Sequence, residues 1–323
     1  MNHNGDLNLA KKLIEVAQQS QVDIVKFQTF LAANITTKNA KKAVYQNIFS
    51  PETENQFEML QKLELNGKQH KELKECANSK GLEFLSTGFD IESMQMLISL
   101  GIERIKIPSG EITNLPYLRF IAAQGKEIIL STGMSTLKEI DDALSALVKN
   151  GAKLEDITVL HCTTDYPARM KEVNLSAMTA IGREFGVKVG YSDHTIGIEV
   201  SIAAVALGAT IIEKHFTLDR NLPGPDHKAS LEPEELRLLV QGIRNIETAM
   251  GDGMKRPTES ELANKQVARK SLVASKRIQK GELLSEVNVA VKRPGSGISP
   301  MEWDSIIGTV ATTDFSEDDL ITR

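Results

Sequence analysis

Two histidines stand at sequence positions where they could share one ligand. His194 ends the β-rich apolar run 188–194, and His215 lies near the end of the next run, 211–217. On adjacent parallel strands the two imidazoles would come within reach of one ion, with positions left open for substrate and water. Taken alone, either histidine would be interpreted as a core residue whose ring nitrogens are hydrogen-bonded within the protein. The pair predicts a catalytic divalent metal, Mn²⁺, Mg²⁺ or Co²⁺, held by His194 and His215.

A lysine and several hydroxyls lie toward the ends of the run 188–194 and of other apolar runs. Lys106 supplies a point positive charge, and each hydroxyl can donate one hydrogen bond. The hydroxyl residues are Thr87, Ser109, Ser131 and Ser192. Glycines beside them would let backbone N–H groups approach the same ligand. The combination predicts a site for a phosphate-type oxyanion, whereas ordinary helix capping would explain any one of these hydroxyls.

Three charged side chains and a thiol are further candidates. Glu111 follows a Ser-Gly pair and could take a proton or activate water, but a carboxylate there also stabilises a helix N-terminus. Asp226 lies in a Pro-Gly-Pro-Asp-His loop and is either a sugar contact or a turn residue. Arg293, in a Pro- and Gly-rich turn, would by itself be a surface residue. Cys162 is expected to be buried and inert.

Three other histidines carry weaker signals. His3 lies in the N-terminal loop and is either catalytic or merely polar. His161 comes late in an apolar run, but its apolar neighbours favour packing. His70 is expected to be a solvent-facing helix residue.

Repeated β–α units would position these side chains, and that order implies a parallel sheet. The apolar runs are 22–29, 82–88, 104–110, 127–133, 157–163, 188–194 and 211–217. The helical segments are 7–18, 70–79, 91–100, 115–123, 137–149, 176–184, 198–206 and 233–250. The length fits a barrel of about 250 residues and a module of about 60. We predict an α/β fold, a TIM (β/α)₈-type barrel with polar groups at the carboxyl ends of its strands.

The front of the predicted barrel differs from its other units. The first helix begins near Leu7 with no strand before it, and residues 2–6 resemble a loop that follows a strand. A closed barrel has no edges, whereas seven strands leave two edges of unpaired backbone groups. We therefore expect the barrel to lack its first strand, with a gap there or another segment filling it.

The chain changes character after Met250. A Gly-Asp-Gly helix stop is followed by a polar stretch with Pro257, and then by short β-rich runs with turns. These patterns predict a barrel domain over residues 1–254, a linker over 255–266 and a small β-rich domain over 267–323.

Composition excludes several classes of protein. The net charge of −5 favours neither nucleic-acid nor membrane binding, and the apolar runs are too short for a transmembrane helix. Two cysteines make no disulfide framework, so a reducing cytoplasm is expected. The N-terminus lacks the basic-then-apolar pattern of a signal peptide.

Motifs along nearly the whole chain resemble one known family. They are Asn2-His3-Asn4-Gly5, Val25-Lys26-Phe27-Gln28-Thr29, Ser86-Thr87, Lys106 through Glu111, Leu130 through Met134, His161-Cys162-Thr163, Tyr166-Pro167, Ser192 through Thr195, Glu213 through Phe216, Pro223 through Asp226, and Lys292 through Gly295. Together they resemble the sialic acid synthases, the phosphoenolpyruvate-dependent nonulosonate synthases. The resemblance implies a TIM barrel joined to a C-terminal antifreeze-like (SAF) domain. It also implies a domain-swapped homodimer in which that domain covers the partner's active site.

The resemblance assigns roles by position. It implies phosphoenolpyruvate contacts at Thr87, Lys106, Ser109, Ser131, Thr164 and Ser192. It implies metal ligands at His194 and His215. Groups around the reacting centre and the N-acetylated amino sugar would be Lys26, Gln28, Glu111, Tyr166 and Asp226. Arg293 would be offered to the neighbouring subunit's sugar.

Two departures from the family pattern refine the expected function. Thr164 stands where N-acetylneuraminate synthases usually carry Asn, and this and the 107–114 motif resemble the N,N′-diacetyllegionaminate synthases. The favoured sugar is therefore 2,4-diacetamido-2,4,6-trideoxymannose. The chain also lacks the family's first strand and its glutamate, which predicts weak activity.

Three alternative functions remain open from the sequence. The chain could be an N-acetylneuraminate synthase that uses N-acetylmannosamine. It could be a catalytically impaired barrel that binds sugar or phosphate. It could also be a Schiff-base aldolase that uses Lys26 or Lys106, which stand where barrel aldolases place a lysine.

Overall fold

The computed structural model describes residues 1–40 and 55–323. These residues form two compact units, Met1–Gly251 and Asp252–Arg323, which are described separately. Among the described helices, none is both long enough and apolar enough to cross a membrane.

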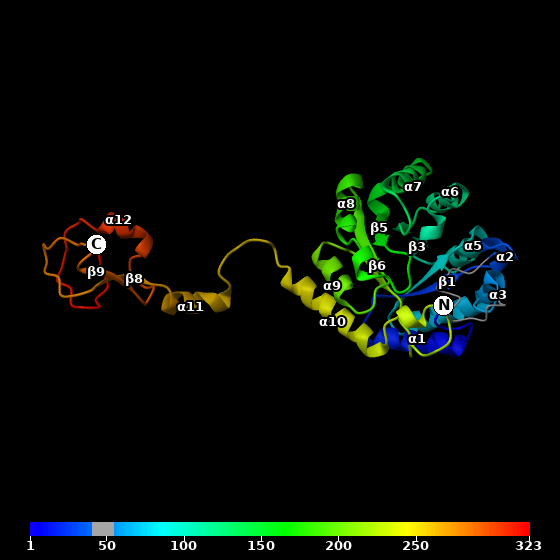
Figure 1. Cartoon of the computed structure of the whole chain (residues 1–323), viewed down its shortest axis with the longest axis horizontal. Helices are drawn as coiled ribbons and strands as arrows, with labels where there is room; N and C mark the ends of the chain where they lie inside the picture. The colour runs from blue at the N-terminus through cyan, green and yellow to red at the C-terminus, as the bar shows by residue number, and fades with distance from the viewer. Residues whose placement is uncertain (41–54) are drawn as a thin grey trace. The chain divides into compact units, whose positions relative to one another are not determined.

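The first unit is built on seven parallel strands in sequential order, curled into a partial barrel (Figure 1). They are β1 (Ile24–Thr29), β2 (Glu83–Gly88), β3 (Arg104–Ile107), β4 (Glu127–Ser131), β5 (Ile157–Cys162), β6 (Lys188–Asp193) and β7 (Ile212–Lys214). All seven predicted runs are strands, trimmed by a few residues. Pro108 shows one cause of the trimming, because proline has no N–H to continue a ladder after β3.

Helices flank the sheet: the first precedes β1, the last follows β7, and the others lie between consecutive strands (Figure 1). They are α1 (Leu7–Gln19), α2 (Ala32–Ile35), α3 (Gln56–Gln61), α4 (Gly67–Ser79), α5 (Ile91–Ser99), α6 (Leu115–Ala122), α7 (Leu137–Lys149), α8 (Ser176–Phe185), α9 (Glu199–Ala206) and α10 (Pro233–Ala249). All eight predicted helical segments are present. The start of helix α7 is predictable from the sequence, because Thr136 and Glu139 have the spacing of a capping box and form a complete one.

The inner face of the curled sheet is apolar near the start of the strands and polar near their ends. Leu85, Ile129 and Leu160 pack together inside the sheet, beside Ile24 and Ile211. Side chains two positions apart share one face of a strand. The next inward positions are therefore Lys26, Thr87, Ser131, Cys162 and Glu213. This alternation places polar groups at the carboxyl end of the barrel.

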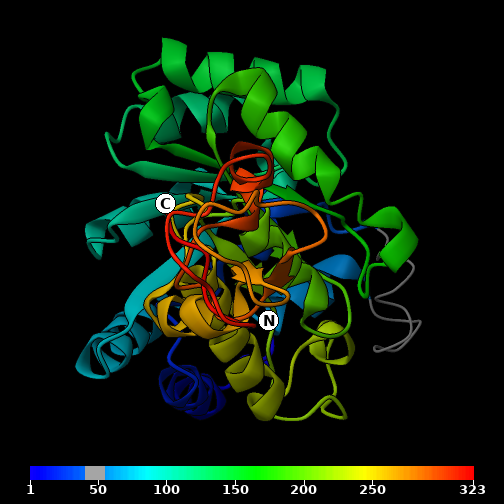
Figure 2. The same ribbon diagram turned by 90° about the vertical axis from the view of Figure 1, so that its left-hand side faces the viewer.

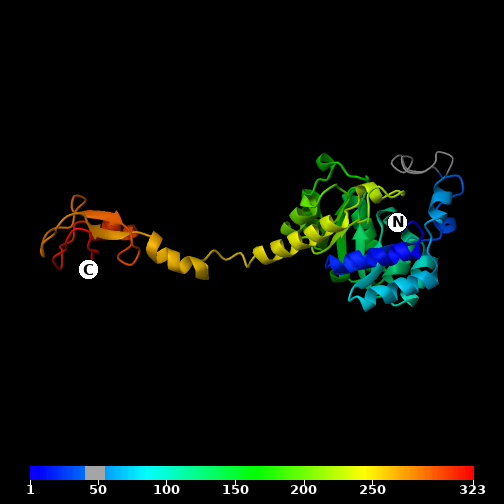
Figure 3. The same ribbon diagram turned by 90° about the horizontal axis from the view of Figure 1, so that it is seen from below.

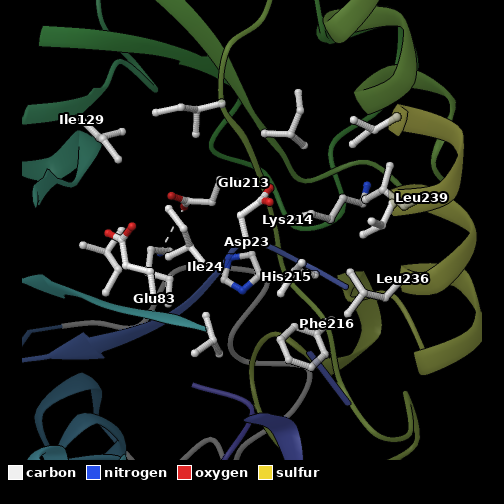
Figure 4. Close-up of a pocket in the computed structure, with 18 of the residues that line it drawn as sticks. Asp23, Ile24, Glu83, Ile129, Glu213, Lys214, His215, Phe216, Leu236 and Leu239 are labelled. Atoms are coloured by element: carbon white, nitrogen blue, oxygen red, sulfur yellow. Dashed lines mark ion pairs between the residues drawn. The ribbon is translucent and has the colours of Figure 1, made fainter. Parts of the chain in front are cut away.

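Strands β1 and β7 are the two edges of the sheet, and within the described residues no strand joins them. A cavity of about 430 Å³ lies at this seam, lined by residues of β1 and β7 and by Leu236 and Leu239 of α10 (Figure 4). Helices α1 and α10 lie side by side on the outer side (Figures 1 and 3). The expected gap in the barrel is thus confirmed for the described part of the chain.

The second unit is a small β-rich domain (Figures 2 and 3). Strands β8 (Ser271–Ala274) and β9 (Val289–Lys292) pair antiparallel, and isolated bridges join Leu283 to Val310 and Ile278 to Phe315. Helix α12 (Trp303–Ile306) packs Ile306 into the apolar core of this unit.

Part of the segment that the sequence suggested as a linker is helical. Helix α11 spans Glu259–Ala268, and Thr258 and Glu261 form a capping box at its start. No residue of this helix is buried, so its sequence lacks the apolar period from which a helix is predicted.

Candidate active site

A pocket of about 180 Å³ opens at the carboxyl ends of the barrel strands. Its lining includes most of the predicted site residues, namely Lys26, Gln28, Thr87, Lys106, Ser109, Ser131, Thr164, Tyr166, Ser192, His194 and His215. Pockets for drug-sized ligands are larger, at roughly 300–1,000 Å³. The enclosed part of this site therefore suits a small ligand.

The two histidines directly follow the adjacent strands β6 and β7, and their rings lie close together. Their ring centroids are 5.5 Å apart, and the Tyr166 ring lies 4.1 Å from that of His194. His194 Nδ1 donates to the carbonyl of Thr163 at 2.7 Å, which leaves Nε2 unprotonated in the neutral ring. Burial lowers the pKa of His194 to about 4 and that of His215 to about 3. Both imidazoles are therefore neutral at pH 7.

Asp226 lies beside this pair on the loop after β7. Its Oδ2 is 3.8 Å from His215 Nδ1, but the low pKa of His215 means that this contact is not an ion pair at neutral pH. Burial raises the pKa of Asp226 above its ordinary value. The loop is tied to the N-terminal loop, because Asn4 Nδ2 donates to the Pro223 carbonyl at 2.8 Å.

The histidines fit a divalent ion in donor chemistry. Two neutral imidazoles are suitable nitrogen ligands, and the Thr163 carbonyl orients His194 as outer partners commonly orient metal ligands. Within residues 1–40 and 55–323, no group of three or more His, Cys, Asp or Glu side chains could hold a metal. An ion at His194 and His215 would thus take most of its ligands from substrate and water.

Glu213 is a functional candidate that the sequence reasoning missed. Its carboxylate lies 3.1 Å from Lys26 Nζ and 3.8 Å from Lys106 Nζ. Burial alone would raise its pKa, but the Lys106 and Lys26 cations outweigh burial and hold the pKa below its ordinary value. The signal was available, because Glu213 is two residues before His215 in the predicted apolar run 211–217, and residues two apart in a strand share one face.

Lys106 is enclosed at the floor of the pocket. Its side chain is 3% exposed, and Nζ donates to Ser131 Oγ at 2.5 Å. Burial lowers the pKa of Lys106, while the Glu213 carboxylate opposes that shift. Two lysines and one carboxylate lie together here, so the formal charge of the cluster is +1, which favours an anionic ligand.

A tight group of side chains surrounds Gly133 at the end of β4. Ser109 Oγ accepts from the Gly133 N–H at 2.9 Å and lies 3.3 Å from Cys162 Sγ. A Cβ added at Gly133 would lie 2.1 Å from Thr164 Oγ1 and 2.9 Å from Ser109 Oγ. The absence of a side chain at Gly133 is thus what allows these groups to converge.

We predict that Gly133→Ala raises the KM for the anionic substrate by about tenfold or more. The methyl would displace Thr164 and Ser109, and the loss of one hydrogen bond to a charged ligand costs about 1.5–3 kcal/mol. Gly110→Ala is the matched control for an added methyl in the pocket lining, because a Cβ at Gly110 meets nothing within 4 Å. Steady-state kinetics of both variants measure the effect. Equal KM values in the two would show that Gly133 does not shape the site.

Some predicted residues lie outside the pocket lining. Glu111 is in the short 3₁₀ helix Ser109–Glu111 and accepts from Asn114 Nδ2 at 2.5 Å. Arg293 belongs to the second unit, where it is exposed and its Nε donates to the Ala268 carbonyl. Their proposed roles stay predictions.

The solvent-facing position expected for His70 is wrong. This residue is fully buried. Its Nδ1 donates to the Asn66 carbonyl at 3.0 Å, and Nε2 accepts from the Thr29 hydroxyl at 2.7 Å. Both ring nitrogens are satisfied inside the unit, so burial costs little.

Comparison with known proteins places this arrangement in a family. The sequence pattern of the NeuB family matches residues 13–255. The chain belongs to the NeuB family. The SAF domain pattern matches residues 269–323 of this NeuB-family chain, so the predicted resemblance and the type of its C-terminal domain are confirmed.

Relatives within the NeuB family match nearly the whole chain. The N,N′-diacetyllegionaminic acid synthase of Campylobacter jejuni is 58% identical over 321 residues, 99% of this chain and 96% of that protein. Its namesake in Legionella pneumophila is 49% identical over 311 residues, 96% and 87% of the two chains. The N-acetylneuraminic acid synthetase of Leptospira borgpetersenii, crystallised with citrate, is 35% identical with a TM-score of 0.71, covering 81% of this chain and 86% of that one.

Proposed function

We propose that this chain condenses phosphoenolpyruvate with 2,4-diacetamido-2,4,6-trideoxymannose to form N,N′-diacetyllegionaminate and phosphate. The observation that carries the proposal is one pocket that holds both a positive cluster, Lys26 and Lys106, and a facing pair of neutral imidazoles, His194 and His215. The names of the two most similar relatives reported above point to the same product.

The positive cluster and its hydroxyls suit phosphoenolpyruvate. Lys106 and Ser131 are already joined by a hydrogen bond, and Ser192 Oγ lies 3.4 Å from Glu213 Oε1. Donors held in place before the ligand arrives stabilise its charges without reorganisation. We assign the phosphate and carboxylate of phosphoenolpyruvate to the hydroxyls and lysines of this cluster.

The histidine pair suits the aldehyde of the open-chain sugar. A divalent ion held by His194 and His215 would supply Lewis-acid polarisation of that carbonyl. Thr163 fixes the orientation of His194, and Tyr166 covers its ring. These contacts hold His194 in the pocket that also contains the lysines, where the aldehyde end of the sugar would bind next to phosphoenolpyruvate.

The chemical steps balance without a redox partner. The C3 carbon of phosphoenolpyruvate attacks the aldehyde, whose oxygen takes up a proton and becomes a hydroxyl, and water adds at C2, with Glu111 proposed to take the proton from that water. The tetrahedral intermediate then loses phosphate by C–O cleavage, and the proton of its C2 hydroxyl leaves with the phosphate as the C2 carbonyl forms. Glu213 is a poor base for this step, because its pKa is held low by two lysines.

Phosphate release from phosphoenolpyruvate tests the proposal, measured with each sugar and with and without a chelator. We expect a higher kcat/KM for 2,4-diacetamido-2,4,6-trideoxymannose than for N-acetylmannosamine. A preference for N-acetylmannosamine would instead indicate an N-acetylneuraminate synthase. Borohydride trapping of pyruvate on Lys26 or Lys106, with indifference to the chelator, would indicate the aldolase. Binding without phosphate release would indicate an impaired barrel.

We further propose a homodimer in which Arg293 serves the partner's site. A mixture of Arg293→Ala protein with His215→Ala protein should then recover part of the wild-type activity, because a mixed dimer holds one intact composite site. Lys292→Ala is the matched control, because Lys292 is an exposed cation directly before Arg293. The absence of recovery after verified subunit exchange would show that Arg293 does not act in the partner's site.

A further inference from the structure

The residues directly before the two histidines, Asp193 and Lys214, form a buried ion pair that the proposed chemistry does not use. Asp193 and Lys214 precede His194 and His215, and they are Cα partners in the β6–β7 ladder. Their side chains are 0% and 2% exposed, and Lys214 Nζ lies 2.8 Å from Asp193 Oδ2. Figure 4 shows Glu213 and Lys214 pointing to opposite sides of β7. The pair therefore faces the helices and does not reach the ligand.

The Asp193 carboxylate is satisfied at both oxygens. Oδ1 accepts from Thr195 N at 2.8 Å and from Thr195 Oγ1 at 2.7 Å, while Oδ2 accepts from Ser201 Oγ at 2.7 Å. Lys214 Nζ also donates to the Thr195 carbonyl at 2.6 Å. One compact network thus connects β6, the turn after His194, helix α9 and β7.

Strand β7 needs such an anchor because its own ladder is short. It has three residues, Ile212–Lys214, and it is an edge of the sheet, paired on one side by β6 alone within the described chain. A slip of one residue in a strand turns every side chain to the opposite face. Such a slip would withdraw Glu213 and His215 from the pocket together.

We propose that the buried Asp193–Lys214 pair is a positioning device that fixes the register of β7 and thereby the separation of His194 and His215. Buried ion pairs contribute little net stability compared with an apolar pair of similar size, and specifying one register is their best-supported use. The inference deepens the proposed function and rests on its metal role only for the second measurement below.

The test replaces the pair rather than one partner, because a single change would leave an uncompensated buried charge. The double variant Asp193→Leu/Lys214→Met should fold, with a lower Tm than the wild type, because the buried Thr195 N–H and Ser201 hydroxyl lose their acceptor. Hydrogen exchange of the metal-free full chain should then show faster exchange of the β7 amides relative to those of β5. Unchanged relative exchange at β7 would overturn the inference, whether or not the protein binds metal.

The second measurement is affinity for Mn²⁺ by calorimetry, together with the visible spectrum of bound Co²⁺. We expect the double variant to bind Mn²⁺ about 10–100-fold more weakly, the range seen when partners that orient metal ligands are removed, with an altered Co²⁺ spectrum. Equal affinity in variant and wild type would also overturn the inference. A wild type that binds no metal refutes the metal proposal and leaves the exchange experiment to decide the positioning role.

The control is Glu83→Gln. Glu83 pairs with Arg104 at 2.7 Å, also between neighbouring strands but at the opposite end of the barrel. This variant should change neither exchange at β7 nor affinity for Mn²⁺. If it changed both to the same extent as the double variant, the effect would be one of general stability and the inference would fail.

Discussion

Replacing His194 or His215 with alanine is expected to abolish metal-dependent turnover while the barrel stays folded. Each imidazole would be one of two side-chain ligands to the proposed ion, since the described residues provide no third His, Cys, Asp or Glu to such a group. Loss of a partner that merely orients a metal ligand costs roughly 10–100-fold, so loss of a ligand itself should exceed about 100-fold. Phosphate release across a titration of Mn²⁺ measures the effect.

His161→Gln is the matched control for this experiment. His161 is also near the end of a strand, but its Nε2 donates to the Val173 carbonyl at 2.8 Å and its side chain does not line the pocket. Its replacement should leave the metal response unchanged. Full activity in both His194→Ala and His215→Ala would refute the metal assignment.

Lys106→Ala is expected to raise the KM for phosphoenolpyruvate by about 10- to 150-fold, with little change in the KM for the sugar. Loss of a charge-assisted contact costs about 1.5–3 kcal/mol, which gives this range. The change also leaves Glu213 opposite Lys26 alone, so the net positive charge of the cluster disappears. Initial rates over a matrix of both substrate concentrations separate the two KM values.

A second change checks the electrostatic reason. Glu213→Gln introduced together with Lys106→Ala would restore one net positive charge through Lys26, so part of the affinity for phosphoenolpyruvate should return. A Lys106→Ala enzyme whose KM for phosphoenolpyruvate equals the wild-type value would place the phosphate elsewhere.

Strand positions and most pocket residues were predictable because they depend on local pattern. The apolar runs bury both faces of a parallel sheet, and parallel strands of one barrel present their carboxyl ends at the same side. Thr87, Lys106 and Ser131 lie toward the ends of such runs, and all three line one pocket. Their convergence follows from topology without knowledge of any side-chain rotamer.

The errors arose where a residue's partner is distant in sequence. His70 has a helical neighbourhood of polar residues, yet its burial depends on Thr29, which comes from β1. Glu213 was read only as the neighbour of His215, although the lysines that hold its charge come from β1 and β3. The hydrophobic period of a sequence segment gives no information about contacts with residues that are distant in sequence.

The sequence by itself determined the order of strands and helices, the end of the barrel that carries the chemistry, and the family. These follow from hydrophobic period and from motifs that are contiguous in the chain. Only the tertiary structure decided that Glu213 joins Lys26 to Lys106, that Gly133 makes room for Thr164 and Ser109, and that an ion pair lies behind the histidines. The physical reason is that charge balance and steric room are properties of groups brought together by folding, whereas strand period belongs to the chain itself.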